Sequence, residues 1–107
     1  MPTHHTLNPS SSTVHWGYWD SALDPVLRIQ SGDTVTVTSI SGGISRMPED
    51  KSLVRAEHME VVENLKPEIG QHILTGPIWV EGAEPGDTLE VRIQDIKLAD
   101  SWGHNFI

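Results

Sequence analysis

The sequence has 107 residues, the size of one domain, with 15 Asp and Glu against 7 Lys and Arg and a formal net charge of −8. This acidic balance predicts no nucleic-acid partner and no membrane partner, because both kinds of surface are bound largely through Lys and Arg. There is no cysteine, which excludes disulfide scaffolds, Cys-ligated zinc and thiol nucleophiles.

Residues 1–12 are polar and turn-rich and are predicted to be a loose leader, so the domain is expected to span 13–107. The leader lacks the basic flank and apolar stretch of a secretory signal, and the expected location is therefore the cytoplasm. Aromatic and β-branched residues crowd 13–20, which predicts a strand interrupted at Gly17.

A short strand is predicted at 26–29, and the period-two alternation over 34–40 marks a half-buried strand. From 49 to 65 apolar residues recur at helical spacing, which predicts one helix with His58 packed at the core edge.

Residues 78–80 are predicted to form a short strand, and 88–98 alternate again with a phase slip that indicates a β-bulge. The predicted fold class is mainly β: an antiparallel sandwich with one short inserted helix, forming part of a larger domain.

The pattern small-Gly-Asp-Thr-apolar-polar-Val occurs twice, at 31–37 and 85–91. Glycine permits a tight turn, aspartate can bond the nearby backbone, and threonine opens a strand. We therefore expect Asp33 and Asp87 to have structural roles.

Without thiols, the histidines are the main candidates for chemistry, and His15 and His72 lie in the most unusual local contexts. Two imidazoles and a carboxylate can hold a zinc-type ion, with Asp20, Asp95 and Asp100 as possible carboxylates. No compact ligand motif occurs, so spacing by itself favours ordinary hydrogen-bonded histidines.

Four tryptophans stand beside one Phe and one Tyr. Trp16 and Trp19 have three possible roles: filling a small core, lining a pocket beside His15, or stacking on a carbohydrate. No Gly-x-Ser-x-Gly elbow, phosphate loop or dinucleotide fingerprint is present.

The sequence resembles the acetamidase/formamidase family at three places: HWGYWD (15–20), PVLRIQSGDTV (25–35) and the ungapped HILTGPIWVEGAEPGDTLEV (72–91). The last is the most specific, and Asp95-Ile96 and Trp102-Gly103-x-Asn105 fit as well.

The resemblance implies hydrolysis of short amides, such as formamide or acetamide, to the acid and ammonia on a CUB-like or jelly-roll-like β-sandwich. It implies a divalent metal, zinc first and calcium second. The resemblance makes His15 and His72 the ligand candidates, while Asp20 and Asp95 are weaker candidates, expected to move protons. Trp16 and Trp19 would contact the small amide.

Family members are several times this length, and the chain corresponds to their N-terminal portion. We therefore expect activity to need the missing C-terminal portion, and we expect a homo-oligomer or association with the remaining part of the enzyme. The rival hypothesis is a non-catalytic β-sandwich module for binding or assembly, whose open sheet edge would pair with a partner.

Overall fold

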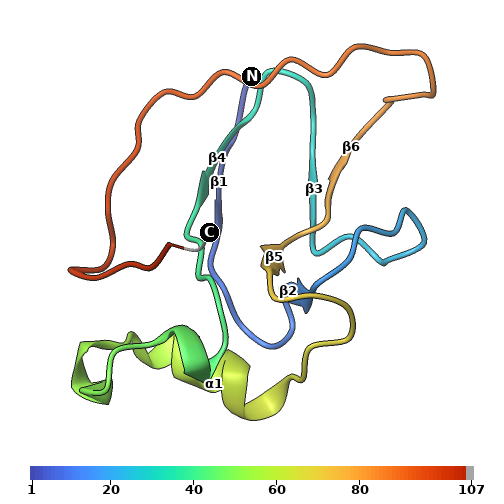
Figure 1. The fold of residues 1–107 in the computed structure, drawn as a ribbon. Helices are drawn as coiled ribbons and strands as arrows, with labels where there is room; N and C mark the ends of the chain where they lie inside the picture. Colours follow the sequence, from blue (N-terminus) through green and yellow to red (C-terminus); the bar gives the residue numbers. More distant parts are fainter. Residues whose placement is uncertain (106–107) are drawn as a thin grey trace.

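The computed structural model describes residues 1–105. Its elements, in chain order, are β1 (His4–Leu7), β2 (Val14–Trp16), β3 (Leu27–Ile29), β4 (Thr34–Val37), the 3-10 helices η1 (Ile44–Arg46) and η2 (Lys51–Leu53), α1 (Ala56–Asn64), β5 (Ile73–Thr75) and β6 (Ile78–Val80). Figure 1 shows the strands above α1. In this part of the chain, no helix has both the length and the apolarity to cross a bilayer.

The strands form three separate pairs. β1 and β4 are parallel, β3 and β6 are parallel, and β2 and β5 are antiparallel. The protein is mainly strand with one α-helix, as expected, but the antiparallel sandwich is not confirmed because two of the three described pairs are parallel. Alternation within a strand reports which face is buried and carries no information on the direction of a distant partner.

The expected loose leader contains a strand, which is a correction to the sequence prediction. β1 occupies residues 4–7 and pairs with β4 in the register His4–Thr34 to Leu7–Val37. Leu7 is buried. The leader has no visible periodicity, and its order comes from a partner about 30 residues away in the sequence.

The helix expected over 49–65 is shorter and divided. Asp50 accepts hydrogen bonds from the Ser52 backbone N–H (3.0 Å) and hydroxyl (2.6 Å), which favours the short turn η2 over a continuous helix. Val54 is in an extended conformation, and α1 begins at Ala56 and ends at Asn64. The helical spacing is confirmed over α1, whose buried residues are His58 and Val61.

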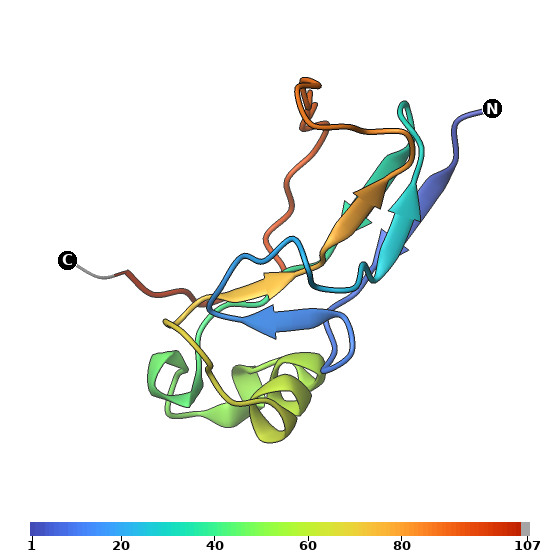
Figure 2. The same cartoon turned by 90° about the vertical axis from the view of Figure 1, so that its right-hand side faces the viewer.

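The core lies between the β2–β5 pair and α1, as the second view shows (Figure 2). It consists of the buried side chains of Val14, Trp16, Ile40, Val61 and Ile73. Val62 and Leu65 pack against it from α1 and its C-terminal end. The alternation of β2 and the helical spacing of α1 therefore place their apolar residues on facing surfaces.

Residues 88–98 form no strand in the described part of the chain, contrary to expectation. They belong to an extended arc that follows β6 (Figure 1). The alternation persists locally: Glu90 pairs with Arg92 (2.6 Å) and Asp95 with Lys97 (3.7 Å), both at the i, i+2 spacing of one strand face. Apolar residues remain exposed, namely Leu89, Val91, Ile93, Ile96 and Leu98.

Replacing Leu89, Val91 and Ile93 together by threonine should leave the thermal unfolding midpoint nearly unchanged, because these side chains are exposed by 72–74%. The same change should reduce binding of a hydrophobic dye and raise solubility, since exposed apolar strands promote association. Calorimetry of the 107-residue chain measures the unfolding midpoint, and dye fluorescence measures the exposed apolar surface. A large fall in the midpoint would show that this segment is packed in solution.

The two repeated Gly-Asp-Thr turns are built alike. The Asp33 N–H donates to the Gln30 carbonyl (3.0 Å) while the Gln30 N–H donates to the Asp33 carboxylate (2.9 Å). Asp87 makes the same two bonds with Glu84 (3.0 and 2.9 Å). The expected structural role is confirmed in both turns, and the turn opens β4 in the first case.

Asp33 receives further bonds from the Thr3 N–H (2.9 Å) and from His5 Nε2 (2.9 Å). The backbone donors Gln30 and Thr3, followed by His5, lower the pKa of its carboxyl from 3.8 to about 2. Because this pKa is below that of the unfolded chain, the carboxylate's stabilising contribution is complete above about pH 4 and is lost as the pH falls toward 2.

Asp33→Asn should therefore lower the unfolding midpoint at pH 6, and the deficit relative to wild type should shrink between pH 4 and pH 2. Asp87→Asn is the matched control. It should lower the unfolding midpoint at pH 6 by less than Asp33→Asn does, because the Asp87 turn lacks the bonds that Asp33 receives from Thr3 and His5. Thermal unfolding followed by circular dichroism over this pH range tests the prediction. A constant deficit at every pH would contradict it.

Candidate functional site

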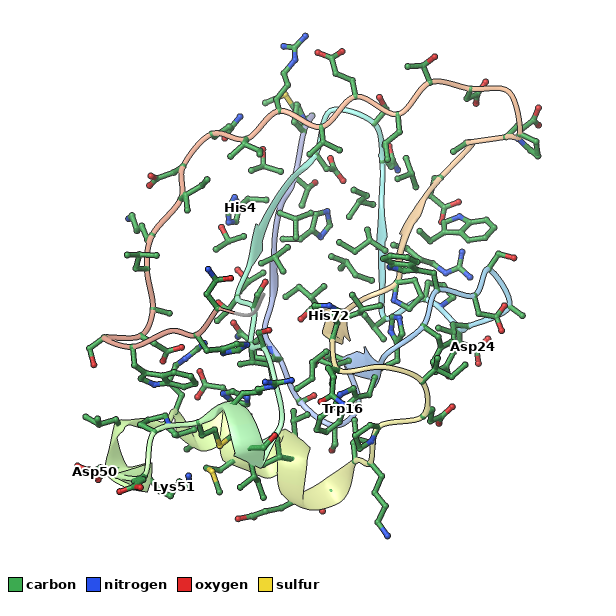
Figure 3. The ribbon with its side chains drawn as sticks, viewed as in Figure 1. His4, Trp16, Asp24, Asp50, Lys51 and His72 are labelled. Carbon is green, nitrogen blue, oxygen red and sulfur yellow. The ribbon has the colours of Figure 1, made fainter. Side chains whose placement is uncertain are left out.

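The β2–β5 pair fixes the position of His15. In its register Trp16 lies opposite Ile73 and His15 lies opposite Leu74. Trp16 and Ile73 are in the core, so His15 and Leu74 occupy the other face. His72 precedes β5 by one residue and is exposed, and continuing the alternation places it on the His15 face. Figure 3 shows Trp16 and His72 at this strand pair, with Trp16 nearer to α1.

His15 is half-buried and held by a backbone carbonyl. Its Nδ1 lies 3.3 Å from the Gly76 oxygen. A carbonyl only accepts, so Nδ1 carries the proton, and Nε2 of the neutral ring is left as an acceptor. The Tyr18 ring meets the imidazole edge-on, at 5.6 Å between centroids and 62° between planes. His15 therefore has a fixed tautomer and a restricted orientation.

Tyr18 connects His15 to two carboxylates. Desolvation, the charge of Glu68, a hydrogen bond to Glu68 and the charge of Asp20, in that order, raise the pKa of Tyr18 above its usual 10. The phenol therefore stays protonated at neutral pH, close to the Glu68 carboxylate. We call His15, Tyr18, Asp20 and Glu68 the β2 cluster.

Glu68 reaches the β2 cluster because residues 68–70 pass directly over Gly17. A Cβ atom on Gly17 would lie 1.3 Å from the Ile69 carbonyl oxygen, and Gly17 has φ +95°. The Glu68 N–H also donates to the Trp16 carbonyl (3.4 Å). Nothing in the sequence around Glu68 indicates this approach, whereas Tyr18 could have been found from its place in the aromatic run beside His15.

The other candidates are scattered. Trp16 is 4% exposed in the core, whereas Trp19 is 89% exposed, so the two tryptophans do not share an environment. Asp20 accepts from the Ala22 N–H (2.8 Å) and lies near Tyr18. Asp95 is in the extended arc beside Lys97. Asp20 thus lies near Tyr18, the ring neighbour of His15, whereas Asp95 lies apart in the arc.

The metal that the resemblance implies needs several donor side chains close together. Across residues 1–105, no three His, Asp or Glu side chains lie close enough together to hold an ion. The described residues therefore do not complete a metal site. His15 by itself has the arrangement of a metal ligand, with one ring nitrogen fixed by a carbonyl and the other available.

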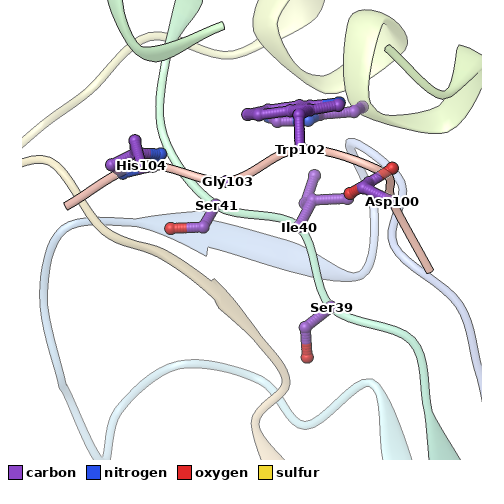
Figure 4. A pocket seen from close by; sticks show the side chains of 8 residues that line it. Ser39, Ile40, Ser41, Asp100, Trp102, Gly103 and His104 are labelled. Atoms are coloured by element: carbon purple, nitrogen blue, oxygen red, sulfur yellow. The ribbon is translucent and has the colours of Figure 1, made fainter. Parts of the chain in front are cut away.

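A separate cavity of about 310 Å³ lies where residues 100–104 pass beside α1 (Figure 4). Its wall consists of Ser39, Ile40, Ser41, His58, Asp100, Trp102, Gly103 and His104. Arg55 holds Asp100 through two bonds, Nε to Oδ1 (2.9 Å) and a terminal nitrogen to Oδ2 (3.0 Å). The Trp102 indole N–H donates to the Leu53 carbonyl (3.1 Å), so this wall is anchored at two points.

His58 is the most buried polar residue of this wall, at 1% exposure. Its Nε2 lies 2.8 Å from the Gly42 carbonyl, while Nδ1 has no hydrogen-bond partner among the described residues. The Trp102 ring lies parallel to the imidazole, 8° between planes and 6.1 Å between centroids. The predicted packing of His58 is confirmed, but one of its nitrogens is unsatisfied, which the sequence did not indicate.

The acetamidase/formamidase family model matches residues 4–107. A Schizosaccharomyces pombe protein, named as an inferred formamidase, is 33% identical over 91 residues, covering 83% of this chain and 20% of its own length. The formamidase of Methylophilus methylotrophus is 56% identical over 36 residues, covering 32% of this chain and 9% of its own. The chain spans a fifth or less of the length of these two relatives. Because the family model matches nearly all of its residues, the chain belongs to the acetamidase/formamidase family.

Proposed function

We propose that this chain supplies part of the active site of an enzyme that hydrolyses short amides, such as formamide or acetamide, to the carboxylic acid and ammonia. The family match and the names of both relatives support this reaction. The observation that carries the assignment to residues is the fixed tautomer of His15, which lies in the β2 cluster.

Amide hydrolysis needs one group to accept a proton from water and another to deliver a proton to the departing nitrogen. Water oxygen bonds to the carbonyl carbon, the carbon–nitrogen bond breaks, and nitrogen leaves as ammonia. The free Nε2 of His15 carries the lone pair that can hold a metal ion, and the Asp20 carboxylate is the group in this cluster that accepts the proton of the attacking water. Tyr18 meets the His15 ring edge-on and restricts its orientation, and Glu68 and Asp20 lie near Tyr18.

A divalent metal is part of the proposal, with His15 and His72 as two of its ligands. Zinc is favoured over calcium because imidazole is a ligand for zinc, whereas calcium takes oxygen donors. Further ligands would have to come from outside the described residues. When bound, such an ion would polarise a carbonyl oxygen or acidify a water.

We further propose that turnover requires polypeptide beyond these 107 residues, in the same cytoplasmic protein or as an associated chain. Two observations support this: the chain spans 20% of the fungal relative, and residues 88–98 have an apolar face with no strand partner in the described region. Asp95 belongs to this segment, so a catalytic role for it would depend on the added polypeptide.

The test compares the 107-residue chain with a hybrid in which it replaces the matched stretch of the Schizosaccharomyces pombe relative. Ammonia release from formamide and acetamide is measured with and without zinc. The isolated chain should show no turnover and the hybrid should be active. In the hybrid, His15→Ala should lower kcat/KM at least about 100-fold, because the loss of a metal ligand should cost no less than the roughly 10- to 100-fold lost with an outer-shell partner.

His4→Ala is the matched control, because His4 lies on β1, contacts Thr36 and should not affect turnover. Trp19→Ala measures any contribution of that exposed ring to substrate binding. A hybrid that unfolds cooperatively but releases no ammonia contradicts the proposal, and so does full activity after removal of His15.

The exposed apolar face of residues 88–98 also supports the second candidate function, a non-catalytic module for binding or assembly. That function predicts association of the isolated chain and no dependence of any activity on His15. Multi-angle light scattering of the 107-residue chain distinguishes a monomer from a homo-oligomer.

A further inference from the structure

We propose that residues 88–98 are a self-pairing strand, through which two copies of this chain join as an antiparallel pair. In this pair Glu90 lies opposite Lys97 of the second copy, and Arg92 lies opposite Asp95 of the second copy. The inference goes beyond amide hydrolysis and depends on no turnover. It names the surface and the partner through which the 107-residue chain associates.

The backbone of residues 88–98 is extended and unpaired. Along this segment no N–H donates to another backbone group, and no carbonyl accepts from one, within residues 1–105. Figure 1 shows the segment as an arc at the outer edge of the molecule. A strand-length stretch of free backbone groups is a template to which a second strand can be added.

The charged side chains of this segment match a second copy of themselves. Along the chain the order is acid, base, acid, base, at Glu90, Arg92, Asp95 and Lys97. Two such segments placed antiparallel about their common centre bring an acid opposite a base at all four positions. The four side chains are 67–87% exposed, so a second strand can reach them. Opposite charges directly across two strands stabilise the pair.

Other ways of pairing two copies are disfavoured by the same charges. A shift of the antiparallel register by two residues places Glu90 opposite Asp95 in one direction and Arg92 opposite Lys97 in the other. Parallel pairing in register places every charge opposite its own copy. Like charges directly opposite are destabilising, so the charges select one register and one direction.

The phase slip in the alternation makes this register possible for two identical strands. Residues directly opposite in an antiparallel pair point to the same face of the sheet. Without a slip, Leu89 and Leu98 would point to opposite faces, because side chains alternate along a strand. The slip brings both to one face, so that Leu89 can lie opposite Leu98, and Val91 opposite Ile96. The paired strands then have one apolar face and one charged face.

A strand from a different protein fits this charge pattern less well unless it carries the same alternation. A strand with charges of one sign would meet like charge at two of the four positions. The existing contacts within the chain are also kept in the pair, since Glu90 bonds Arg92 (2.6 Å) and Asp95 bonds Lys97 (3.7 Å) along each strand. Each charge then has opposite charges both along and across the strands.

The test measures association of the 107-residue chain by sedimentation equilibrium. Pairs of only two strands are weak in water, so the measurement extends to about 1 mM, where dissociation constants of that size are still visible. Wild type should show a reversible monomer–dimer equilibrium. Failure here leaves the proposed hydrolysis untouched, and an inactive hybrid leaves this pairing untouched.

Two exchange variants test the register without changing the composition or the net charge. The first exchanges one ion pair (Asp95→Lys with Lys97→Asp), and the second exchanges the other (Glu90→Arg with Arg92→Glu). Each variant keeps opposite charges along its own strand but places like charges opposite at all four positions of its homodimer. Each alone should therefore associate at least about 10-fold more weakly than wild type.

An equal mixture of the two exchange variants restores opposite charges at all four positions. The mixture should therefore form a heterodimer about as tight as the wild-type dimer, which also shows that both variants are folded. The matched control exchanges the exposed ion pair between β3 and β6 (Arg28→Glu with Glu81→Arg), outside the segment, and should associate like wild type. The proposal is overturned if wild type stays monomeric, if either exchange variant associates as tightly as wild type, or if their mixture stays monomeric.

Discussion

Gly17→Ala should destabilise the protein by about 3 kcal/mol or more and should displace Glu68 from the β2 cluster. The new Cβ would lie 1.3 Å from the Ile69 oxygen, and that neighbour is backbone, so residues 68–70 must move as a unit. Overpacking costs typically 1–3 kcal/mol, and the left-handed φ of +95° adds roughly 1–2 kcal/mol for any residue with a side chain.

The matched control is Gly32→Ala. Gly32 has nearly the same backbone angle, φ +91°, but no atom lies within 4 Å of the position that its Cβ would take. Gly32→Ala should therefore lose only the stability that a side chain costs at a left-handed backbone angle, about 1–2 kcal/mol. Urea unfolding of the three proteins measures the difference. Equal losses for Gly17→Ala and Gly32→Ala would show that residues 68–70 do not pack on Gly17.

The Gly17 variant also has a spectroscopic consequence. If Glu68 leaves Tyr18, the largest electrostatic cause of the raised Tyr18 pKa is removed. The phenol should then titrate at a lower pH than in wild type, as followed by absorbance at alkaline pH. An unchanged titration would mean that Glu68 remains in place.

Trp16→Ala should have the other large effect, a loss of roughly 3–5 kcal/mol, which is the range for removing a buried aromatic side chain. Trp16 is 4% exposed and packs with Val14, Ile40, Val61 and Ile73. A loss of this size approaches the whole stability of a small domain, so the variant could be largely unfolded at 25 °C. Urea unfolding measures the loss of stability, and a variant that is already unfolded in water shows no cooperative transition.

Two further variants keep this prediction testable. Trp16→Phe retains most of the apolar area and removes an indole nitrogen that is buried without a described partner, so it should cost much less than Trp16→Ala. Trp19→Ala should change stability by less than about 0.5 kcal/mol because its ring is 89% exposed. Similar losses at both tryptophans would contradict the assignment of Trp16 to the core.

Local patterns in the sequence predicted several features correctly. The Gly-Asp-Thr turns at Asp33 and Asp87, the strands at 27–29 and 78–80 and the helical spacing of α1 each depend on residues close together in the chain. The family could be recognised for the same reason, because its most specific segment, 72–91, is contiguous. These features need no knowledge of the rest of the fold.

Features that depend on distant residues could not be predicted this way. The order of β1 comes from its pairing with β4, about 30 residues away, so its own residues predicted only a loose segment. No pattern around Glu68 predicted its position in the β2 cluster, because that position depends on the absence of a side chain at Gly17. The alternation at 88–98 was correctly recognised, but a strand also needs a neighbour for its backbone groups, and the described residues provide none.

The sequence by itself determined the family, the strand-rich character, the turn chemistry and the candidate imidazoles, because these follow from residue type and short spacing. Only the tertiary structure decided which tryptophan is buried, which nitrogen of His15 is free, which carboxylates join its cluster, and that a nitrogen of His58 lacks a partner. Burial and hydrogen-bond partners are properties of surfaces that meet across long stretches of chain, and their pairing is fixed when the core packs.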